Sequence, residues 1–257
     1  MPGGIAKEKP RAMMSLSNSR FANYVRSVCC GKPDFPPLQA SHDFFKSLDQ
    51  TRPLAEYDFV VVDCELTGMI PSQDEIVSIG AVRIRNLNVD PSDCFYSLVE
   101  PRIPLPKIST LIHQITPDQL KGMPRLRRVL PEFVDFCSNS LLVGHHVGMD
   151  MSFLNRAARR IFGARLVNPC LDTLRLAQVY QAELWENYYD QYKLNVSYNL
   201  TDLSERFGLP LFQKHNALQD ALQTAYLFLF LVRKLKKGGI ETLADLYNAG
   251  RMWRWYF

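Results

Sequence analysis

One short stretch, residues 59–68 (FVVVDCELTG), constrains the fold of this chain more than any other. Its first half is apolar and β-branched, which predicts a strand buried on both faces and therefore central in a sheet. Side chains alternate along a strand, so Asp63 and Glu65 point to the same side at its C-terminal end, just before a turn at residues 67–68. Neighbouring carboxylates in a partly buried site either keep a proton or hold a cation. We expect a hard divalent metal ion there.

The length of 257 residues favours one domain of ~200 residues with extensions at its ends. Charge is uneven along the chain: residues 1–33 hold six Lys or Arg residues and one Glu, whereas the whole chain has a net charge of +4. A basic arm of this kind suits nucleic-acid phosphates or an anionic membrane surface, and a merely solvated terminus is the commoner alternative.

The six cysteines form no Cys-x-x-Cys pair and no zinc-like spacing with the five histidines, so we expect free thiols in a reducing compartment. The sequence contains no apolar run long enough to span a bilayer, and its N-terminus lacks the apolar core of a signal peptide. We therefore expect a cytoplasmic protein without a membrane partner.

Strand patterns come first along the chain and helical patterns follow, with a turn-prone segment at 86–92 between two of the strands. This order predicts an α/β protein with a mixed sheet of about five strands flanked by helices. The last helix begins with Asn216 as N-cap, in a sequence that resembles a capping box with Gln219. The expected strands are 59–65, 75–84, 94–99, 141–143 and 166–171, and the expected helices are 126–137, 148–163, 173–184, 199–207 and 217–237.

We divide the chain into a basic, partly helical N-terminal arm (1–50), a main domain (51–237), and a C-terminal helix with an aromatic tail (238–257). Pro36-Pro37 continues a break in the arm. The last six residues, MWRWYF, are too apolar to be free in water and are expected to pack on the core or on a partner. The aromatic residues between 185 and 198 could stack on bases, although packing on their own domain is the commoner role.

Three more residues carry chemistry. Asp150 shares a helical stripe with Leu154 and Ile161 that should face the sheet, so its carboxylate is aimed inward; the simpler alternative is an acid favoured by the helix dipole. With Asn216 as N-cap, His215 lies in the preceding loop and Asp220 in the first turn, so the two side chains can approach one site from different elements.

In order, Asp63-x-Glu65, Asp150 in its Gly-His-x-x-x-x-Asp setting, and His215-x-x-x-x-Asp220 resemble the three motifs of the DEDDh 3′→5′ exonucleases. That is the superfamily of the polymerase III proofreading (epsilon, DnaQ-like) subunit. The resemblance runs from about residue 58 to 235 and includes residues 101–115 (PRIPLPKISTLIHQI) and 171–173 (LDT). It implies an RNase H-like mixed five-stranded sheet flanked by helices. It also implies an enzyme that hydrolyses phosphodiester bonds at the 3′ end of single-stranded or frayed nucleic acid, DNA favoured, and releases nucleoside 5′-monophosphates.

The resemblance further implies two divalent ions, Mg²⁺ or Mn²⁺, held by the carboxylates of Asp63, Glu65, Asp150 and Asp220, with Asp63 bridging both. Magnesium prefers carboxylate and water oxygens, and two ions ~3.5–4 Å apart can stabilise both the attacking and the leaving oxygen of a phosphodiester. His215 is the implied general base, because a histidine side chain with its reference pKa of ~6.5 can accept a proton from water near neutral pH.

The resemblance also suggests substrate contacts. Leu66 and Thr67 match the segment beside the terminal nucleotide, and for Leu66 a purely packing role is an equal alternative. His146 stands where the family usually has asparagine, and Met149 replaces a common phenylalanine; neither change removes a metal ligand. Arg156 and Arg160, four apart on one helix, are either phosphate contacts or part of a solvated basic face.

Two other functions are compatible with such a fold. A non-catalytic nucleic-acid-binding or polymerase-docking module would be favoured by loss of an acid or of the histidine, and all five are present. An RNase H-like endonuclease also uses clustered carboxylates, but the histidine five residues before the last aspartate argues against it. The expected partners are single-stranded nucleic acid 3′ ends and, as a further candidate, a DNA polymerase subunit. The choice between DNA and RNA, and the oligomeric state, stay open at this stage.

Overall fold

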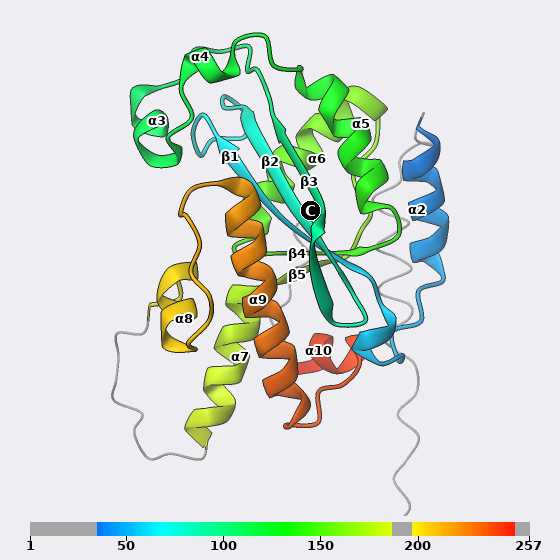
Figure 1. Cartoon of the computed structure of the whole chain (residues 1–257). Coiled ribbons are helices and arrows are strands. Elements are labelled where there is room, and N and C mark those ends of the chain that lie inside the picture. The colour runs from blue at the N-terminus through cyan, green and yellow to red at the C-terminus, as the bar shows by residue number, and fades with distance from the viewer. Residues whose placement is uncertain (1–34, 187–196, 250–257) are drawn as a thin grey trace, which may run out of the picture.

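The computed structural model describes residues 35–186 and 197–249, built around one five-stranded sheet with the strand order β3-β2-β1-β4-β5. The first three strands are antiparallel neighbours, whereas β4 and β5 run parallel to β1. This confirms the predicted mixed sheet, with the Asp63 strand at its centre (Figure 1). The strands are β1 (Phe59–Leu66), β2 (Ile76–Arg85), β3 (Asn88–Leu98), β4 (Leu141–Gly144) and β5 (Cys170–Asp172).

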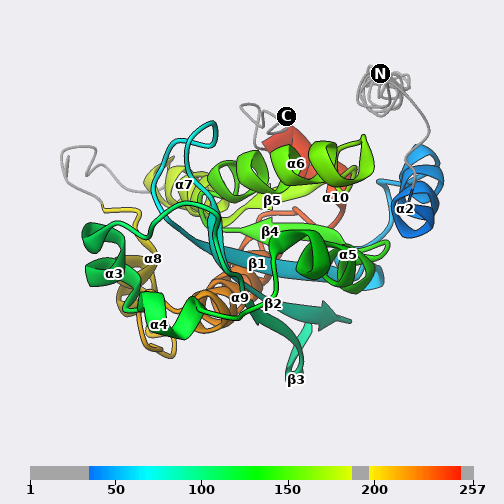
Figure 2. The same ribbon diagram turned by 90° about the horizontal axis from the view of Figure 1, so that it is seen from above.

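Helices cover both faces of the sheet, as Figure 2 shows from above. The alternation of β1 side chains explains the two layers. Phe59 and Val61 point into a core shared with α9 and α7, whereas Val60 and Val62 point into a core shared with α5 and α6. The helices are α2 (Pro36–Lys46), the short 3₁₀ turn η1 (Leu54–Glu56), α3 (Lys107–His113), α4 (Pro117–Leu120), α5 (Leu126–Cys137), α6 (Gly148–Phe162), α7 (Thr173–Glu186), α8 (Leu200–Arg206), α9 (Ala217–Lys236) and α10 (Leu243–Ala249).

Two strand predictions were wrong in extent. The expected turn at 86–92 is only Asn86-Leu87, both with positive φ (51° and 54°), and β3 pairs with β2 from Asn88 onward. Such a two-residue turn follows the right-handed twist of a hairpin, so the ladder continues directly through it. The expected strand 166–171 is reduced to residues 170–172. Leu166 and Val167, which suggested the longer strand, are instead buried in the core as part of the preceding loop.

The break expected at Pro36-Pro37 is instead the start of α2. Proline is tolerated in the first helical turn because the N–H groups there have no helical partner. Leu38 and Phe45 are fully buried and attach α2 to the domain. The basic arm up to residue 33, the tail 252–257 and the aromatic residues 187–196 lie outside the described residues.

The remaining predictions can be checked in the part of the chain that is described. Asn216 caps α9 by accepting a hydrogen bond from the Gln219 N–H (3.2 Å), but the Gln219 side chain accepts from Gln213 N (2.8 Å) and not from the cap, so the capping box is incomplete. Cysteines 64, 94, 137 and 170 are free thiols, as expected. Within the described ranges, every helix is too short or too polar to cross a membrane.

Candidate active site

Asp63 and Glu65 point from β1 toward the α9 side of the sheet, as the strand spacing predicted. The start of α9 approaches the sheet closely because Gly80, the β2 partner of Asp63, has no side chain. A Cβ atom on Gly80 would lie 2.2 Å from backbone atoms of Ala217 and Leu218. This backbone contact brings the first turn of α9, with Asp220, to the end of β1.

Three carboxylates meet at this point. Oxygen atoms of Asp63, Glu65 and Asp220 all lie within 4.8 Å of one another. Carboxylate oxygens at this spacing can share one hard divalent cation, so the donor set fits Mg²⁺ or Mn²⁺. The two strand carboxylates and the helix carboxylate lie near opposite ends of the domain sequence: Glu65 and Asp220 are 155 residues apart.

Asp150 lies beside this group but is not one of the three. It is buried in the first turn of α6, and its Oδ1 accepts a hydrogen bond from the backbone N–H of Cys64, at 3.1 Å. The inward orientation predicted from the α6 stripe is therefore confirmed. Its carboxylate is near enough to raise the pKa of Asp63, which places it at the edge of the same negatively charged site.

Burial raises the pKa of all four carboxylates, and repulsion by neighbouring carboxylates adds to it for Asp63, Glu65 and Asp150. Burial is the larger cause for Asp63, whose pKa is raised well above the usual value, and the charges of the other three add to it. Burial and then Asp220 raise the pKa of Glu65 to about 7, and burial raises that of Asp150 to about 8. The pKa of Asp220 is raised by burial, which hydrogen bonds from the His215 and Asn216 backbone oppose. A bound cation would remove this repulsion.

His215 lies in the loop before α9, with a positive φ of 59°, and lines the same cavity as Asp63 and Asp220. Sequence analysis predicted this approach of a loop histidine to the carboxylates. The other side chains around the cavity come from the β4–α6 loop, the start of α8 and the loop before α9: His145, Asn199, Leu200, Thr201, Asp202 and Lys214.

The loop that carries His146 is fixed by two residues that the sequence analysis did not select as site residues. His145 uses both ring nitrogens, Nδ1 with the Thr173 hydroxyl (2.9 Å) and Nε2 with the Tyr198 carbonyl oxygen (2.8 Å). Asp172 accepts hydrogen bonds from the backbone N–H groups of His146 and Leu174, both at 3.0 Å. In the sequence, Asp172 was indicated only as part of the segment 171–173 (LDT) that resembles the exonuclease family.

The side chains of the expected substrate residues Leu66 and Thr67 are largely engaged in contacts within the protein. Leu66 is half-buried against the α5/α6 core. Thr67 is 1% exposed; its hydroxyl donates to Asp74 (3.1 Å) and accepts from the Glu75 N–H (3.0 Å). Its carbonyl oxygen accepts from the Ser109 hydroxyl, which ties the loop after β1 to α3. Thr67 therefore shapes this loop, and contact of either side chain with substrate stays a prediction.

His113 is a further residue near the site that the sequence analysis did not assign. It is buried at the end of α3, and burial lowers its pKa, as does the charge of nearby His215. Its Nδ1 accepts from the Ile115 N–H (3.1 Å), so Nε2 carries the proton; this atom has no hydrogen-bond partner among the described residues.

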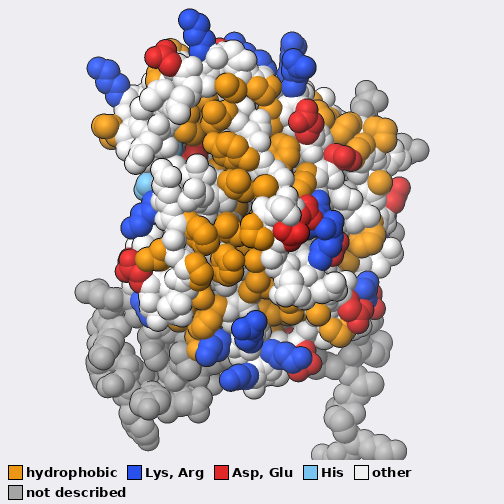
Figure 3. All heavy atoms as spheres, in the orientation of Figure 1, with side chains coloured by type: hydrophobic (Ala, Val, Ile, Leu, Met, Phe, Trp, Pro, Cys, Tyr) orange, Lys and Arg blue, Asp and Glu red, His pale blue; other side chains and the backbone are white. Residues whose placement is uncertain are grey.

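Exposed apolar side chains surround the carboxylate end of the sheet. Figure 3 shows hydrophobic side chains gathered along the middle of the face that carries α9 and β3, with Lys and Arg at its margins. The most exposed large hydrophobic residues lie on α3, where Leu111 is 79% exposed, and on the loop after β1, where Met69 is 70% exposed. Met149, at the start of α6, is exposed as well. Leu and Met side chains can pack against the faces of unstacked bases.

Comparison with known proteins agrees with this geometry. The family model for exonucleases of the RNase T type matches residues 60–228. The DNA polymerase III subunit epsilon of Aquifex aeolicus is 32% identical over 208 residues, which are 80% of this chain and 95% of that protein. A PolC-type DNA polymerase III from Caldanaerobacter subterraneus subsp. tengcongensis is 34% identical over 191 residues, 74% of this chain, but the chain spans only 13% of its length.

Solved structures show the same fold at lower identity. Exonuclease X in complex with 5′ overhanging duplex DNA superposes with a TM-score of 0.55 at 21% identity, covering 75% of this chain and 99% of that one. E. coli exonuclease I with a dT13 oligonucleotide gives a TM-score of 0.60 at 16% identity, covering 71% and 42%. The RNase H-like architecture expected from the three motifs is thereby confirmed.

Proposed function

This chain belongs to the RNase T family of exonucleases, within the DEDDh superfamily of the polymerase III proofreading subunit, and we propose that it is a metal-dependent 3′→5′ exonuclease. Its substrate is the 3′ end of single-stranded or frayed nucleic acid, DNA favoured, and its products are nucleoside 5′-monophosphates. One observation carries the proposal: Asp63, Glu65 and Asp220 converge within 4.8 Å, with His215 on the same cavity.

Asp63, Glu65 and Asp220 would hold Mg²⁺ or Mn²⁺, and Asp150 would complete the negative site of a two-ion enzyme. The ions supply charge stabilisation to the phosphoryl oxygens when bound. His215 accepts the proton of the attacking water as the water oxygen bonds to phosphorus. The bond from phosphorus to the 3′ oxygen of the preceding nucleotide breaks, and that oxygen takes a proton from solvent water to become the new 3′-hydroxyl. When ionised, the four carboxylates make the cavity negative, so a phosphodiester is then repelled unless a cation is bound.

The exposed apolar side chains on α3 and on the loop after β1 support the proposal that the substrate is a single strand. Leu111, Ile112 and Ile108 are exposed on α3, and Met69 and Ile70 are exposed on the loop after β1, which the hydrogen bond from Ser109 to Thr67 ties to α3. Side chains of this type can contact bases that are not stacked on a complementary strand, whereas they offer nothing to the phosphate exterior of a duplex. His146, which replaces an asparagine usual in the family, would lie beside the terminal nucleotide.

The relatives named as parts of DNA polymerase III support a second element of the proposal, association with a DNA polymerase subunit. Binding of the full chain to a purified polymerase subunit, measured by light scattering of the mixture, tests it. A mixture that runs as two separate species at micromolar concentration would count against proofreading in a complex and favour a free-standing enzyme.

Digestion of 5′-labelled single-stranded DNA and RNA of matched sequence tests the chemistry. We expect a ladder that shortens from the 3′ end with Mg²⁺ or Mn²⁺, stops with chelator, and is absent for His215→Asn. Asparagine tolerates the positive φ of this position, so that variant should fold. The faster ladder identifies DNA or RNA as substrate. Cutting of a circular strand would indicate an endonuclease instead, and absence of any cutting by the folded, metal-supplied chain would indicate the non-catalytic module.

A further inference from the structure

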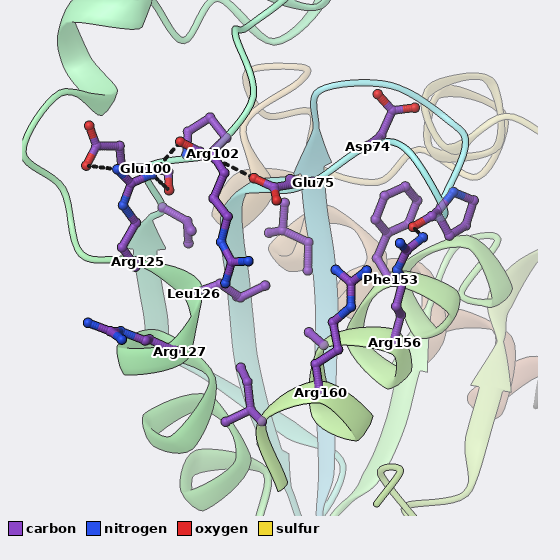
Figure 4. A pocket seen from close by; sticks show the side chains of 16 residues that line it. Asp74, Glu75, Glu100, Arg102, Arg125, Leu126, Arg127, Phe153, Arg156 and Arg160 are labelled. Carbon is purple, nitrogen blue, oxygen red and sulfur yellow. Dashed lines mark hydrogen bonds and ion pairs between the residues drawn. The ribbon is translucent and has the colours of Figure 1, made fainter. Parts of the chain in front are cut away.

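A second concave site lies on the α5/α6 side of the sheet, away from the carboxylates. Its wall is formed by the loop 71–76, residues 99–102 after β3, the start of α5 and the middle of α6. Glu65 and Asp63 point to the α9 side, so the sheet separates the two sites. Figure 4 shows arginine side chains around this pocket from three different segments. We call it the arginine pocket.

The arginines divide into two groups. Arg156 donates to the carbonyl oxygens of Pro71 and Ser72, and Arg125 donates to the carbonyl oxygen of Glu100 (3.2 Å) and pairs with its carboxylate (3.3 Å). The guanidinium groups of the other three have no hydrogen bond or ion pair with any described residue. These are Arg102, Arg127 and Arg160.

The free arginines surround an apolar floor. Arg102 and Arg160 extend into the pocket from opposite sides, and Arg127 stands at its margin (Figure 4). Leu126 and Ile161, both half-buried, and the buried Phe153 line the same pocket. Guanidinium groups bind carboxylates and phosphates in a bidentate manner, and an apolar floor binds an apolar side chain. The occupant must offer both.

Acidic residues on the wall distinguish between the anions that could enter. Glu100 is paired with Arg125, Glu75 accepts from the Arg102 backbone N–H, and Asp74 accepts from Thr67 and Ile70. These acidic neighbours disfavour anions of high charge density, and a polyphosphate chain also has no apolar group to place on the floor. A peptide has carboxylates for the arginines, N–H donors for the acidic wall residues and apolar side chains for the apolar floor, so it can bind every part of the pocket.

We infer that the arginine pocket binds an acidic peptide segment of a protein partner, with carboxylates on Arg102 and Arg160 inside the pocket and on Arg127 at its margin, and with one large apolar side chain against Leu126 and Ile161. This site is distinct from the nuclease centre. The partner is recognised by charge complementarity at the rim and by burial of an apolar anchor at the centre, the arrangement common to specific peptide sites.

Selection from a phage-displayed library of random twelve-residue peptides on the full chain tests the inference. We expect selected peptides rich in Asp and Glu around one large apolar residue. The most frequent peptide, labelled and measured by fluorescence anisotropy, should bind Arg127→Gln/Arg160→Gln about tenfold or more weakly than wild type. The matched control is Arg128→Gln/Arg159→Gln, with the same charge change on the same two helices but outside the pocket. It should bind within about twofold of wild type.

Three outcomes would overturn the inference: no peptide is enriched, the enriched peptides are not acidic, or Arg127→Gln/Arg160→Gln binds them as well as wild type. A dT12 oligonucleotide measured in the same way with Ca²⁺ provides the competing test. If the affinity for dT12 falls in Arg127→Gln/Arg160→Gln and the affinity for peptides does not, the pocket is a nucleic-acid-binding site. Nuclease activity is measured separately for both variants, so failure of the peptide site is distinguishable from failure of the proposed exonuclease.

Discussion

The carboxylates at the C-terminal end of β1 and the arginines on the α5/α6 side of the sheet differ in their exposure to water. Glu65 and Asp150 are 9% and 6% exposed and repel each other, whereas Arg102, Arg127 and Arg160 are exposed. Like charges that are buried destabilise the fold until a cation binds, but exposed like charges are screened and cost little. The first region therefore needs its ligand for stability as well as for function, and the second is free to bind or release a partner.

The largest effect should come from removing a buried charge. Asp63→Asn keeps the shape of the side chain but loses a metal ligand, so the exonuclease rate should fall by roughly 10³-fold, the effect of several kcal/mol of transition-state stabilisation. The same change relieves repulsion, so the melting temperature without metal should rise. Asp135→Asn, an exposed carboxylate on α5, is the control and should change neither. A melting temperature that falls in Asp63→Asn would contradict the view that this carboxylate is destabilising when no cation is bound.

The pH dependence of stability sharpens the comparison. Because the folded pKa of Glu65 (about 7) and of Asp150 (about 8) is above the unfolded value, the folded chain holds more protons than the unfolded chain between about pH 4 and 8. Stability without metal should therefore fall as the pH rises from 5 to 8, by up to roughly 3 kcal/mol for Glu65. Urea unfolding in chelator measures this.

Adding Mg²⁺ at pH 8 should recover most of the loss, because the cation binds only the folded, ionised site. A free energy of unfolding that stays constant or increases from pH 5 to 8 in chelator would contradict the charge repulsion argued for the carboxylates.

The contact between sheet and helix at Gly80 offers a third test. Gly80→Ala places a methyl group 2.2 Å from the α9 backbone, so α9 must shift and Asp220 moves away from Asp63. Overpacking of this kind costs about 1–3 kcal/mol of stability. The nuclease rate should fall even at saturating metal, whereas peptide binding at the arginine pocket should stay within about twofold of wild type. Loss of both activities would indicate general unfolding and not a local displacement.

Local pattern was sufficient to predict much of this fold. The apolar run of β1, the helical spacing of α5 and the Asn216 cap of α9 each depend on neighbours in sequence, and each was found as expected. The start of β3 was wrong because the two-residue turn at Asn86-Leu87 is selected by pairing with β2, which no local pattern reports. The same is true of β5, whose apolar approach packs as a loop.

The two functional regions differ in the same respect. The alternation of a strand places Asp63 and Glu65 on one side, so half of the carboxylate group follows from spacing alone. Its meeting with Asp220 depends on the close contact of α9 with Gly80, which is a long-range feature. The arginine pocket is assembled from segments that lie far apart in the sequence, and of its free arginines only Arg160 was noticed, as one of two basic residues on a helix.

Arg156 is a side chain that links the two regions, and it provides the smallest and last prediction. It was expected to contact phosphate or solvent, but it fixes Pro71 and Ser72, in the loop that begins at Thr67 and carries the exposed Met69. Arg156→Gln should loosen this loop and raise KM for a single-stranded oligonucleotide by about three- to tenfold, the effect of roughly one ordinary hydrogen bond, with little change in kcat.

Arg160→Gln, one helical turn further on α6 and without such bonds, is the matched control and should leave KM unchanged. If instead Arg160→Gln raised KM as much as Arg156→Gln, the substrate strand would have to reach the arginine pocket, and the separation of the two regions by the sheet would be wrong. If neither raised it, the loop after β1 would hold its position through Thr67, Asp74 and Ser109 alone. The pair of variants therefore measures whether the hydrogen bonds from Arg156 on α6 to the loop after β1 contribute to substrate affinity.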